Sequence, residues 1–161
     1  MKPTSRQGRK PGAPSRTAAT VDNGILDELL GYHLRRAQAA VFNDFMRTMA
    51  EDQITPGQFG VLTLIDRNPD LNQSALARVL GIERSTMVAV IDRLEERRLV
   101  ARHESASDRR SNVLGLTARG KALLAAVKPK VRRHEKRIAT GLEAGEVGTL
   151  IELLRRISAA G

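Results

Sequence analysis

The fold of this chain is decided by one short stretch of its sequence, NQSALARVLGIERSTMVAVIDRLEERR, which runs from Asn72 to Arg98. Asn72 can cap a short helix, and Gly81 can end that helix in a left-handed conformation. A second helix can begin soon after, around Glu83, and extend to Arg98. Two short helices joined by a turn that contains glycine form a helix-turn-helix, which we therefore predict here. The expected inner side of the first helix carries Leu76, Val79 and Leu80.

The second predicted helix has two different faces. Each residue of an α-helix advances by about 100°, so positions three and four apart share a side. The apolar face carries Val88, Ile91 and Leu94. The opposite face starts with small, hydrogen-bonding side chains and carries Ser85, Thr86, Ala89 and Arg93. Such a face suits a helix that enters a DNA major groove by its N-terminal end, because bulky side chains there obstruct the approach.

A hairpin is predicted directly after this helix. Two short apolar runs, at 99–103 and 112–116, predict two strands, and the polar residues between them predict a long charged tip. A helix-turn-helix followed by such a hairpin is a winged helix. The sequence therefore predicts a mainly α-helical fold with a small β-hairpin.

Amphipathic helices are predicted on both sides of the winged helix. Before it, apolar residues recur every three or four positions across 22–51. Thr55 then opens the capping box of a helix expected to run to about Asn68. After the hairpin, Thr117 can cap the first of two helices expected over 118–158. The stripe across 22–51 consists of Leu26, Leu30, Leu34, Ala37, Val41, Phe45 and Met49.

The net charge of +9 is spread unevenly along the 161 residues. Residues 1–20 carry five basic side chains and no acidic one, and 21–77 carry four basic and eight acidic ones. Basic side chains are again in excess over 78–119, by nine to six, and over 121–161, by nine to four. This distribution indicates a polyanionic partner for one part of the molecule. Charge alone does not distinguish DNA, RNA and an anionic membrane.

The first twenty residues are rich in Pro, Gly and basic side chains and almost lack apolar ones. We therefore expect 1–20 to be a disordered basic arm. Two interpretations of this arm stay open, electrostatic attraction to phosphates and a solubilising leader.

An enzyme is not expected from this sequence. The absence of cysteine excludes a catalytic thiol and a thiolate zinc site, and it is typical of a reducing compartment. His33, His103 and His134 lie on separate predicted elements without metal-ligand spacing, and the glycines of 141–148 lack the Lys and Ser/Thr of a phosphate loop. We expect no catalytic residue, no metal and no cofactor. A reader of single-stranded RNA is also disfavoured, because the basic second half has no aromatic platform.

In the order and spacing of its motifs, the sequence resembles the MarR family of winged-helix transcription regulators over about residues 25–158. The resemblance rests on Gln73–Ala77 with Leu80–Ile82, Asp92–Glu95, Asp108–Arg110, and Leu116 and Thr117 with Gly120. It implies a bacterial, cytoplasmic homodimer with one MarR-like domain over 21–161. In that domain the winged helix covers about 55–117, and the dimerisation helices cover about 22–51 and 118–158. The two winged helices of such a dimer meet successive major grooves of a pseudo-palindromic operator, roughly 34–36 Å apart.

The resemblance also assigns DNA contacts to the second helix of the helix-turn-helix. Ser85 and Thr86 are expected to reach base edges or phosphates, and Arg84 and Arg93 to contact phosphates or base edges nearby. Relatives often carry arginine where this chain has Ala89. Guanine readout is therefore not expected there, and contact with a thymine methyl is the most that Ala89 offers.

The charged wing tip is the second place where the resemblance assigns DNA contacts. Asp108 resembles the acidic residue that orients the tip arginine, and Arg110 resembles the arginine placed in the minor groove. Arg109 is the neighbouring phosphate candidate. Arg98 departs from the family pattern, because relatives commonly have glycine at the end of the recognition helix.

For function, the resemblance implies a ligand-responsive, sequence-specific repressor. Its effector would be a small anion, such as an aromatic acid or its acyl-CoA thioester, held between the first, second and fifth helices. An activator, or a regulator without an effector, is the alternative. The basic run Lys128–Arg137 keeps three interpretations, a solvated face, a contact with flanking DNA or a contact with effector phosphates. The candidate effector residues are Tyr32, His33, Arg35, Arg36, Phe42 and Phe59.

Overall fold

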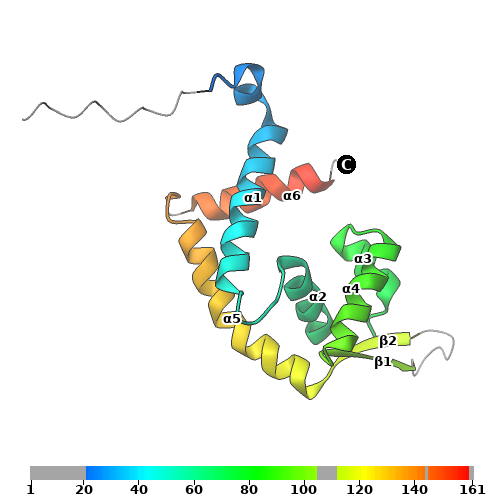
Figure 1. The fold of residues 1–161 in the computed structure, drawn as a ribbon. Helices are drawn as coiled ribbons and strands as arrows, with labels where there is room; N and C mark the ends of the chain where they lie inside the picture. Colours follow the sequence, from blue (N-terminus) through cyan, green and yellow to red (C-terminus); the bar gives the residue numbers. More distant parts are fainter. Residues whose placement is uncertain (1–20, 105–111, 144, 160–161) are drawn as a thin grey trace, which may run out of the picture.

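The computed structural model describes residues 21–104, 112–143 and 145–159, and its elements follow the expected order (Figure 1). The elements are the 3₁₀ helix η1 (Gly24–Glu28), α1 (Leu30–Thr48), α2 (Pro56–Arg67), α3 (Gln73–Leu80), α4 (Arg84–Glu96), β1 (Val100–Glu104), β2 (Asn112–Leu116), α5 (Ala118–Ile138) and α6 (Glu146–Ala159). The predicted fold class, a mainly helical winged helix with a small hairpin, is confirmed. In the described ranges, no helix is both long enough and apolar enough to cross a membrane.

Side-chain caps fix where three of the helices begin. At the start of α2, the Thr55 hydroxyl accepts from the Gln58 N–H, and the Gln58 side-chain oxygen accepts from the Thr55 N–H, both at 3.2 Å. At the start of α3, the Asn72 oxygen accepts a backbone N–H at 2.8 Å, and at the start of α5 the Thr117 hydroxyl accepts another at 3.0 Å. Each cap satisfies a backbone donor that has no partner inside its helix.

The turns after α3 and α4 share one geometry but use different residues. Gly81 follows α3 with a φ of +61°, and Arg98 lies after α4 with a φ of +57°. After α4, the Leu99 N–H donates to the Leu94 carbonyl at 2.9 Å, and the Arg98 N–H donates to the Glu95 carbonyl at 2.7 Å. These two bonds define a Schellman motif. Arg98 therefore adopts the left-handed conformation that glycine adopts more easily, at a cost on the order of 1 kcal/mol.

The wing is a short antiparallel hairpin that packs closely against the start of α5. β1 and β2 pair along their whole length, with Val100 opposite Leu116. The first turn of α5 comes so close to the hairpin that a Cβ on Gly120 would overlap the carbonyl oxygen of Leu99. Gly120 thus sets the docking of α5 on the wing, because a larger residue does not fit there.

The core lies inside the winged helix and against the nearer halves of α1 and α5. Two residues expected inside are exposed, Val79 by 63% and Val88 by 38%. In α3 the buried side is formed by Leu76 and Ala77, and Val79 lies about 110° around the helix from their midpoint. In α4 the buried positions are Met87, Ile91 and Leu94, and Val88 lies about 90° from the centre of that side.

The first helix is shorter than the expected range of 22–51. The chain begins with η1, passes through an extended Leu29 with φ −91° and ψ 116°, and enters α1 only at Leu30. Because Leu29 is extended, the helical hydrogen bonds are interrupted there. The predicted apolar stripe is therefore divided between η1 and α1. Of that stripe, Phe45 and Met49 are buried, whereas Leu30 is 60% exposed.

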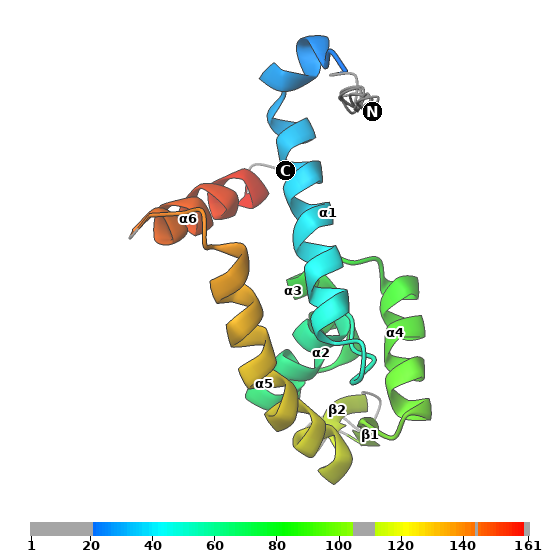
Figure 2. The same ribbon diagram turned by 60° about the vertical axis from the view of Figure 1, so that its left-hand side comes forward.

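The N-terminal part of α1 and the whole of α6 lie at the end of the molecule opposite the wing (Figures 1 and 2). No residue of η1 or α6 is buried. The apolar surface of α6 consists of Val147, Leu150, Ile151, Leu153, Leu154 and Ile157, each between 37% and 46% exposed. Monomeric soluble proteins rarely leave a large contiguous apolar surface in water.

Candidate nucleic-acid interface

The face of α4 expected to read DNA takes no part in packing among the described residues. Ser85, Thr86, Ala89 and Arg93 are all exposed, and Arg84 is exposed at the first position of the helix. The core holds the opposite side of α4, so this helix presents a fixed row of small and basic side chains to the outside. The contacts of these residues with DNA stay a prediction.

Arg102 on β1 joins the wing to α4. Its Nη2 donates to Asp92 Oδ1 at 2.7 Å, and its Nη1 donates to Glu95 Oε2. The backbone N–H of Arg102 donates to the other oxygen of Glu95 at 3.2 Å. Two carboxylates of α4 therefore hold one guanidinium in charge-assisted hydrogen bonds, which fixes the wing relative to the helix. Sequence patterns do not single out Arg102, because its partners lie seven and ten positions away on a different element.

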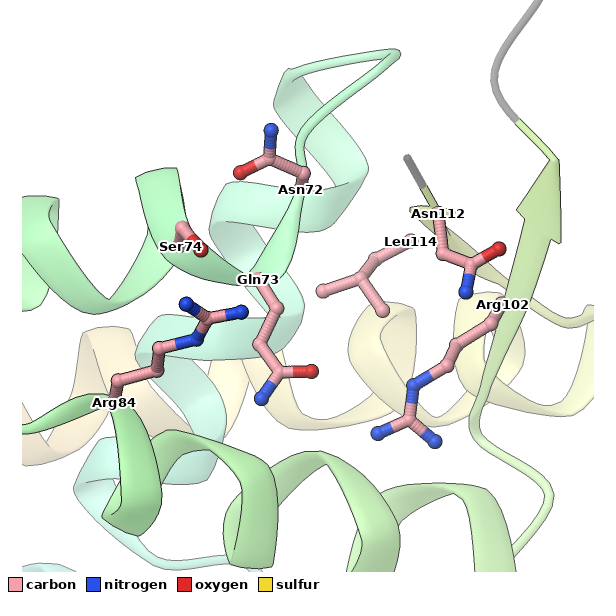
Figure 3. A pocket seen from close by; sticks show the side chains of 7 residues that line it. All are labelled: Asn72, Gln73, Ser74, Arg84, Arg102, Asn112 and Leu114. Carbon is pink, nitrogen blue, oxygen red and sulfur yellow. The ribbon is translucent and has the colours of Figure 1, made fainter. Parts of the chain in front are cut away.

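A polar hollow of about 250 Å³ lies between α3, α4 and the wing (Figure 3). Arg84 extends into it from α4 toward Gln73 at the start of α3, and Arg102 enters from the hairpin side. The hollow therefore brings together hydrogen-bond donors from helices and a strand that are separate in sequence. Its lining residues are Asn72, Gln73, Ser74, Arg84, Arg102, Asn112 and Leu114.

The predicted wing-tip residues Asp108, Arg109 and Arg110 lie outside the described residues, as does the arm 1–20. Their roles in DNA binding remain predictions. The described parts of β1 and β2 do place the base of the wing beside α4.

The six candidate effector residues do not form one cluster. Tyr32 and His33 lie together on α1 with ring centroids 5.5 Å apart, and the Arg36 guanidinium carbon lies 5.5 Å from the Tyr32 ring centroid. Phe59, on α2, packs against Phe45 with ring centroids 6.3 Å apart. The other two candidates are exposed on α1, Arg35 and Phe42. The roles of all six residues in effector binding stay a prediction.

A charged cluster that sequence patterns do not reveal joins α1 to α5. Arg137 Nη2 donates to Asp44 Oδ2 and to Thr48 Oγ1, both at 2.6 Å. His134, only 1% exposed, places Nδ1 2.8 Å from Asp44 Oδ2, and Arg47 donates to Asp44 Oδ1 at 3.1 Å. Arg137, and then His134 and Arg47, hold the pKa of Asp44 well below its usual range. Asp44 in turn raises the pKa of Arg137.

A second hollow, of about 390 Å³, opens beside this cluster between α1 and α5. Asp44 and Arg137 form its polar end. The rest of the lining is apolar and consists of Ala37, Ala40, Val41 and Ile138. The hollow shares no residue with the six effector candidates. Its lining residues lie on α1 and α5, so the hollow forms only where these two helices pack together.

The basic run Lys128–Arg137 is partly neutralised by acidic residues that precede it in sequence. Lys128 pairs with Asp66 at 3.0 Å, and Lys130 pairs with Asp52 at 2.6 Å. Together with the bond from Arg137 to Asp44, these pairs connect α5 to α1, to α2 and to the segment between them. For half of the six bases in this run, the structure therefore favours a role in packing. Arg132, Arg133 and Lys136 are exposed and form no salt bridge with any described residue.

Residues 52–111, which include α2, α3, α4 and the wing, match the model of the MarR family. A protein of Thauera aromatica described as a transcriptional regulator for the hcr operon is 40% identical over 153 residues, which cover 94% of this chain and 92% of the relative.

Solved structures of the transcriptional repressor CouR are also similar. CouR bound to a 23-mer DNA duplex is 46% identical, with a TM-score of 0.82 over 87% of this chain and 99% of CouR. CouR bound to p-coumaroyl-CoA is 44% identical, with a TM-score of 0.80 over 86% of this chain and 98% of CouR. The winged helix, the exposed row of small and basic residues on α4 and this similarity over most of the chain lead to one conclusion: the chain belongs to the MarR family of transcriptional regulators.

Proposed function

We propose that this protein is a transcriptional repressor that binds a pseudo-palindromic DNA operator as a homodimer and leaves it when a small anionic effector binds. The observation that carries the proposal is the similarity to CouR in its DNA complex, at 46% identity over nearly the whole repressor. The exposed row on α4 supports the same function, because a helix with one exposed side can enter a major groove with that side.

The homodimer is supported by the apolar surface at the end of the molecule opposite the wing. The apolar side chains of α6 are all partly exposed, and Leu26, Leu29 and Leu30 at the start of the first helical region are 40–60% exposed. Association with a second copy removes these side chains from water, at roughly 25 cal/mol per Å² of apolar area buried. A dimer built from these helices carries two reading faces, one for each half of the operator.

The effector that we propose is an aromatic acid or its acyl-CoA thioester. CouR supports the thioester, because it binds p-coumaroyl-CoA and shares 44% of its residues with this chain. The hollow between α1 and α5 supports an aromatic group, since most of its lining is apolar and its polar end contains Arg137. Its volume of about 390 Å³ exceeds the ~150 Å³ of a cavity known to bind benzene.

The proposed function is tested by titration of purified protein with DNA. Duplexes selected from a random library by the wild-type protein supply the operator, and fluorescence anisotropy measures its Kd. We expect the operator to bind at least a thousandfold more tightly than random duplex, the lower end of the usual range for specific readers. Equal affinity for both duplexes would contradict a sequence-specific regulator.

The effector is tested by adding p-coumaroyl-CoA or p-coumaric acid to the protein–operator complex. We expect at least one of them to release the operator and to raise the Tm of the free protein, because a ligand shifts an equilibrium only toward the state it binds better. If neither compound changes Tm or operator affinity, this class of effector is wrong. A regulator without such an effector, or an activator, is then the better description.

A further inference from the structure

Arg97, the residue that follows α4, binds the segment that connects α1 to α2. Its Nη1 donates to the Gln53 carbonyl at 2.7 Å, and its Nη2 donates to the Asp52 carbonyl at 3.0 Å. A guanidinium carries its donors in a fixed planar fork, so one side chain can bind two successive carbonyls. Arg97 therefore attaches the end of the reading helix to residues 49–55, which we call the α1–α2 segment.

The α1–α2 segment is held in one conformation. Gln53 has a φ of +53°, and the N–H groups of Asp52 and Gln53 both donate to the Met49 carbonyl, at 3.1 Å and 2.9 Å. Left-handed backbone is costly for a residue with a side chain and persists only where the surroundings hold it. Met49 and Ile54 are fully buried on the two sides of this turn. The core and the hydrogen bonds of the turn therefore fix the carbonyls that Arg97 binds.

Asp52 connects the same segment to α5. Its carboxylate accepts from Lys130 Nζ at 2.6 Å, and only 13% of the Asp52 side chain is exposed. An ion pair shielded in this way is less screened by solvent than a surface pair. Asp52 thus contacts α5 through its side chain and Arg97 through its carbonyl. A displacement of the segment relative to α5 is therefore transmitted to the end of α4.

α5 can bend directly beside this contact. Pro129 lacks the N–H that a helical hydrogen bond requires, and α5 is bent along its length (Figure 1). Before the proline, Lys128 pairs with Asp66 on α2, inside the winged helix. After the proline, α5 pairs with α1 and with the α1–α2 segment. The first half of α5 is therefore attached to the winged helix and the second half to α1, with Pro129 between them.

The hollow proposed for the effector lies between α1 and the second half of α5. An effector that changes the distance between these helices moves the end of α1, and with it the α1–α2 segment. A ligand lowers DNA affinity only if it favours an arrangement of the reading helices that the operator does not. The contact from Arg97 to the segment gives such a ligand a direct route to α4.

We propose that Arg97 is the positioning residue that couples the packing of α1 and α5 to the orientation of the reading helix. In this role Arg97 touches neither the bases nor the effector. It holds α4 at the angle that fits the operator, and it passes a movement of the α1–α2 segment on to α4. The inference rests on the proposed function and names the residue on which its regulation depends.

The first test needs no effector. It uses the ratio of the Kd for random duplex to the Kd for the selected operator, both measured by fluorescence anisotropy. Electrostatic attraction to phosphates acts on both duplexes, so this ratio reports how well the reading helix fits the bases. We expect Arg97→Gln to lower the ratio about three- to tenfold. Asp52→Ala keeps the carbonyl that Arg97 binds but releases Lys130, and is expected to lower the ratio by a smaller factor.

The double variant tests whether Asp52 and Arg97 act along one route. If they do, Asp52→Ala has no further effect in the presence of Arg97→Gln. Independent contributions instead multiply, and that result overturns the route through the α1–α2 segment. The matched control is Arg67→Gln, an exposed arginine at the last position of α2, which is expected to leave the ratio unchanged.

The second test measures the factor by which p-coumaroyl-CoA or p-coumaric acid raises the operator Kd. In Arg97→Gln we expect this factor to fall at least threefold, while calorimetry shows that the free protein binds the compound with wild-type affinity. Arg97→Lys keeps the charge without the fork of donors, so an intermediate factor is expected. A purely structural role lowers Tm and leaves the factor unchanged. If Arg97→Gln does not fold, Arg97→Lys serves in both tests.

The outcomes separate this inference from the proposed function. A folded Arg97→Gln variant that keeps the wild-type ratio, or that responds to the compound by the wild-type factor, overturns the role of Arg97. If neither compound affects the wild type, the proposed effector fails, and the ratio alone decides the role of Arg97. If the wild type binds both duplexes equally, the proposed function itself fails, and the role of Arg97 fails with it.

Discussion

The winged helix and the end of the molecule opposite the wing both carry apolar side chains at helical spacing, but only the winged helix buries them. In the winged helix, Leu76, Ile91 and Leu94 are fully buried against one another and their neighbours. In α6, Ile151 and Leu154 have the same kind of side chain at helical spacing, yet each is more than a third exposed. The winged helix therefore buries its apolar side chains within one chain. The end opposite the wing keeps apolar side chains in water, and a second copy of the chain would bury them.

The largest effect is expected where the winged helix meets α5. Gly120→Ala forces a Cβ into the carbonyl oxygen of Leu99, and neither backbone can move without separating the wing from α5. We expect a loss of about 3 kcal/mol or more in the free energy of unfolding, measured by urea denaturation. The control is Gly57→Ala in the first turn of α2, where an added Cβ meets no atom of the described residues within 4 Å. Equal stability of the two variants would contradict the close packing.

The second prediction concerns the apolar surface of α6. Ile151→Asp places a charge among the exposed apolar side chains, which costs little in a monomer but much in a dimer that buries them. We expect the mass measured by light scattering to fall from dimer to monomer, and operator affinity to drop by more than tenfold. Val79→Asp, at a position 63% exposed on α3, is expected to keep the dimer mass. A dimer that tolerates Ile151→Asp places the interface elsewhere.

The third change concerns the charged cluster around Asp44 that joins α1 to α5. The pKa of Asp44 is lowered in the folded state, so its stabilising effect is complete above the unfolded pKa of about 4 and is lost as pH falls further toward the folded pKa. Asp44→Asn is therefore expected to lower Tm at pH 7 and to flatten the dependence of Tm on pH below about 4. Asp66→Asn, which breaks a single pair with an exposed lysine, is the control with a smaller effect. Identical acid unfolding of wild type and Asp44→Asn would show that this cluster does not respond to acid.

The smallest effect is expected at the end of α4. Arg98 has a φ of +57°, so Arg98→Gly is expected to raise the free energy of unfolding by about 0.5–1 kcal/mol. Gly81→Ala tests the same geometry in the opposite direction, since the φ of Gly81 is +61° and no atom in the described part of the chain lies within 4 Å of an added Cβ. We expect a loss of about 1 kcal/mol from that change. If Arg98→Gly is destabilising, the side chain of Arg98 contributes contacts that outweigh the strain.

The sequence predicts this structure correctly where a feature depends on residues close together in the chain. The caps at Thr55, Asn72 and Thr117 and the left-handed turn at Gly81 lie where the sequence predicts them, because each involves atoms only a few positions apart. The prediction was wrong at Val79, because a helix of eight residues leaves room for more than one choice of inner side. The DNA contacts and effector residues remain predictions from the resemblance.

By itself, the sequence determined the order of the elements, the helix-turn-helix, the wing and the exposed row on α4. Periodicity and capping are local properties, so a linear pattern contains them. Only the tertiary structure decided which charges meet. Asp44 pairs with Arg137, which lies 93 positions later in the sequence. The carboxylates of α4 form salt bridges with Arg102 and not with Arg84. These partnerships depend on how helices pack, and packing is a property of the whole chain that no short stretch of sequence contains.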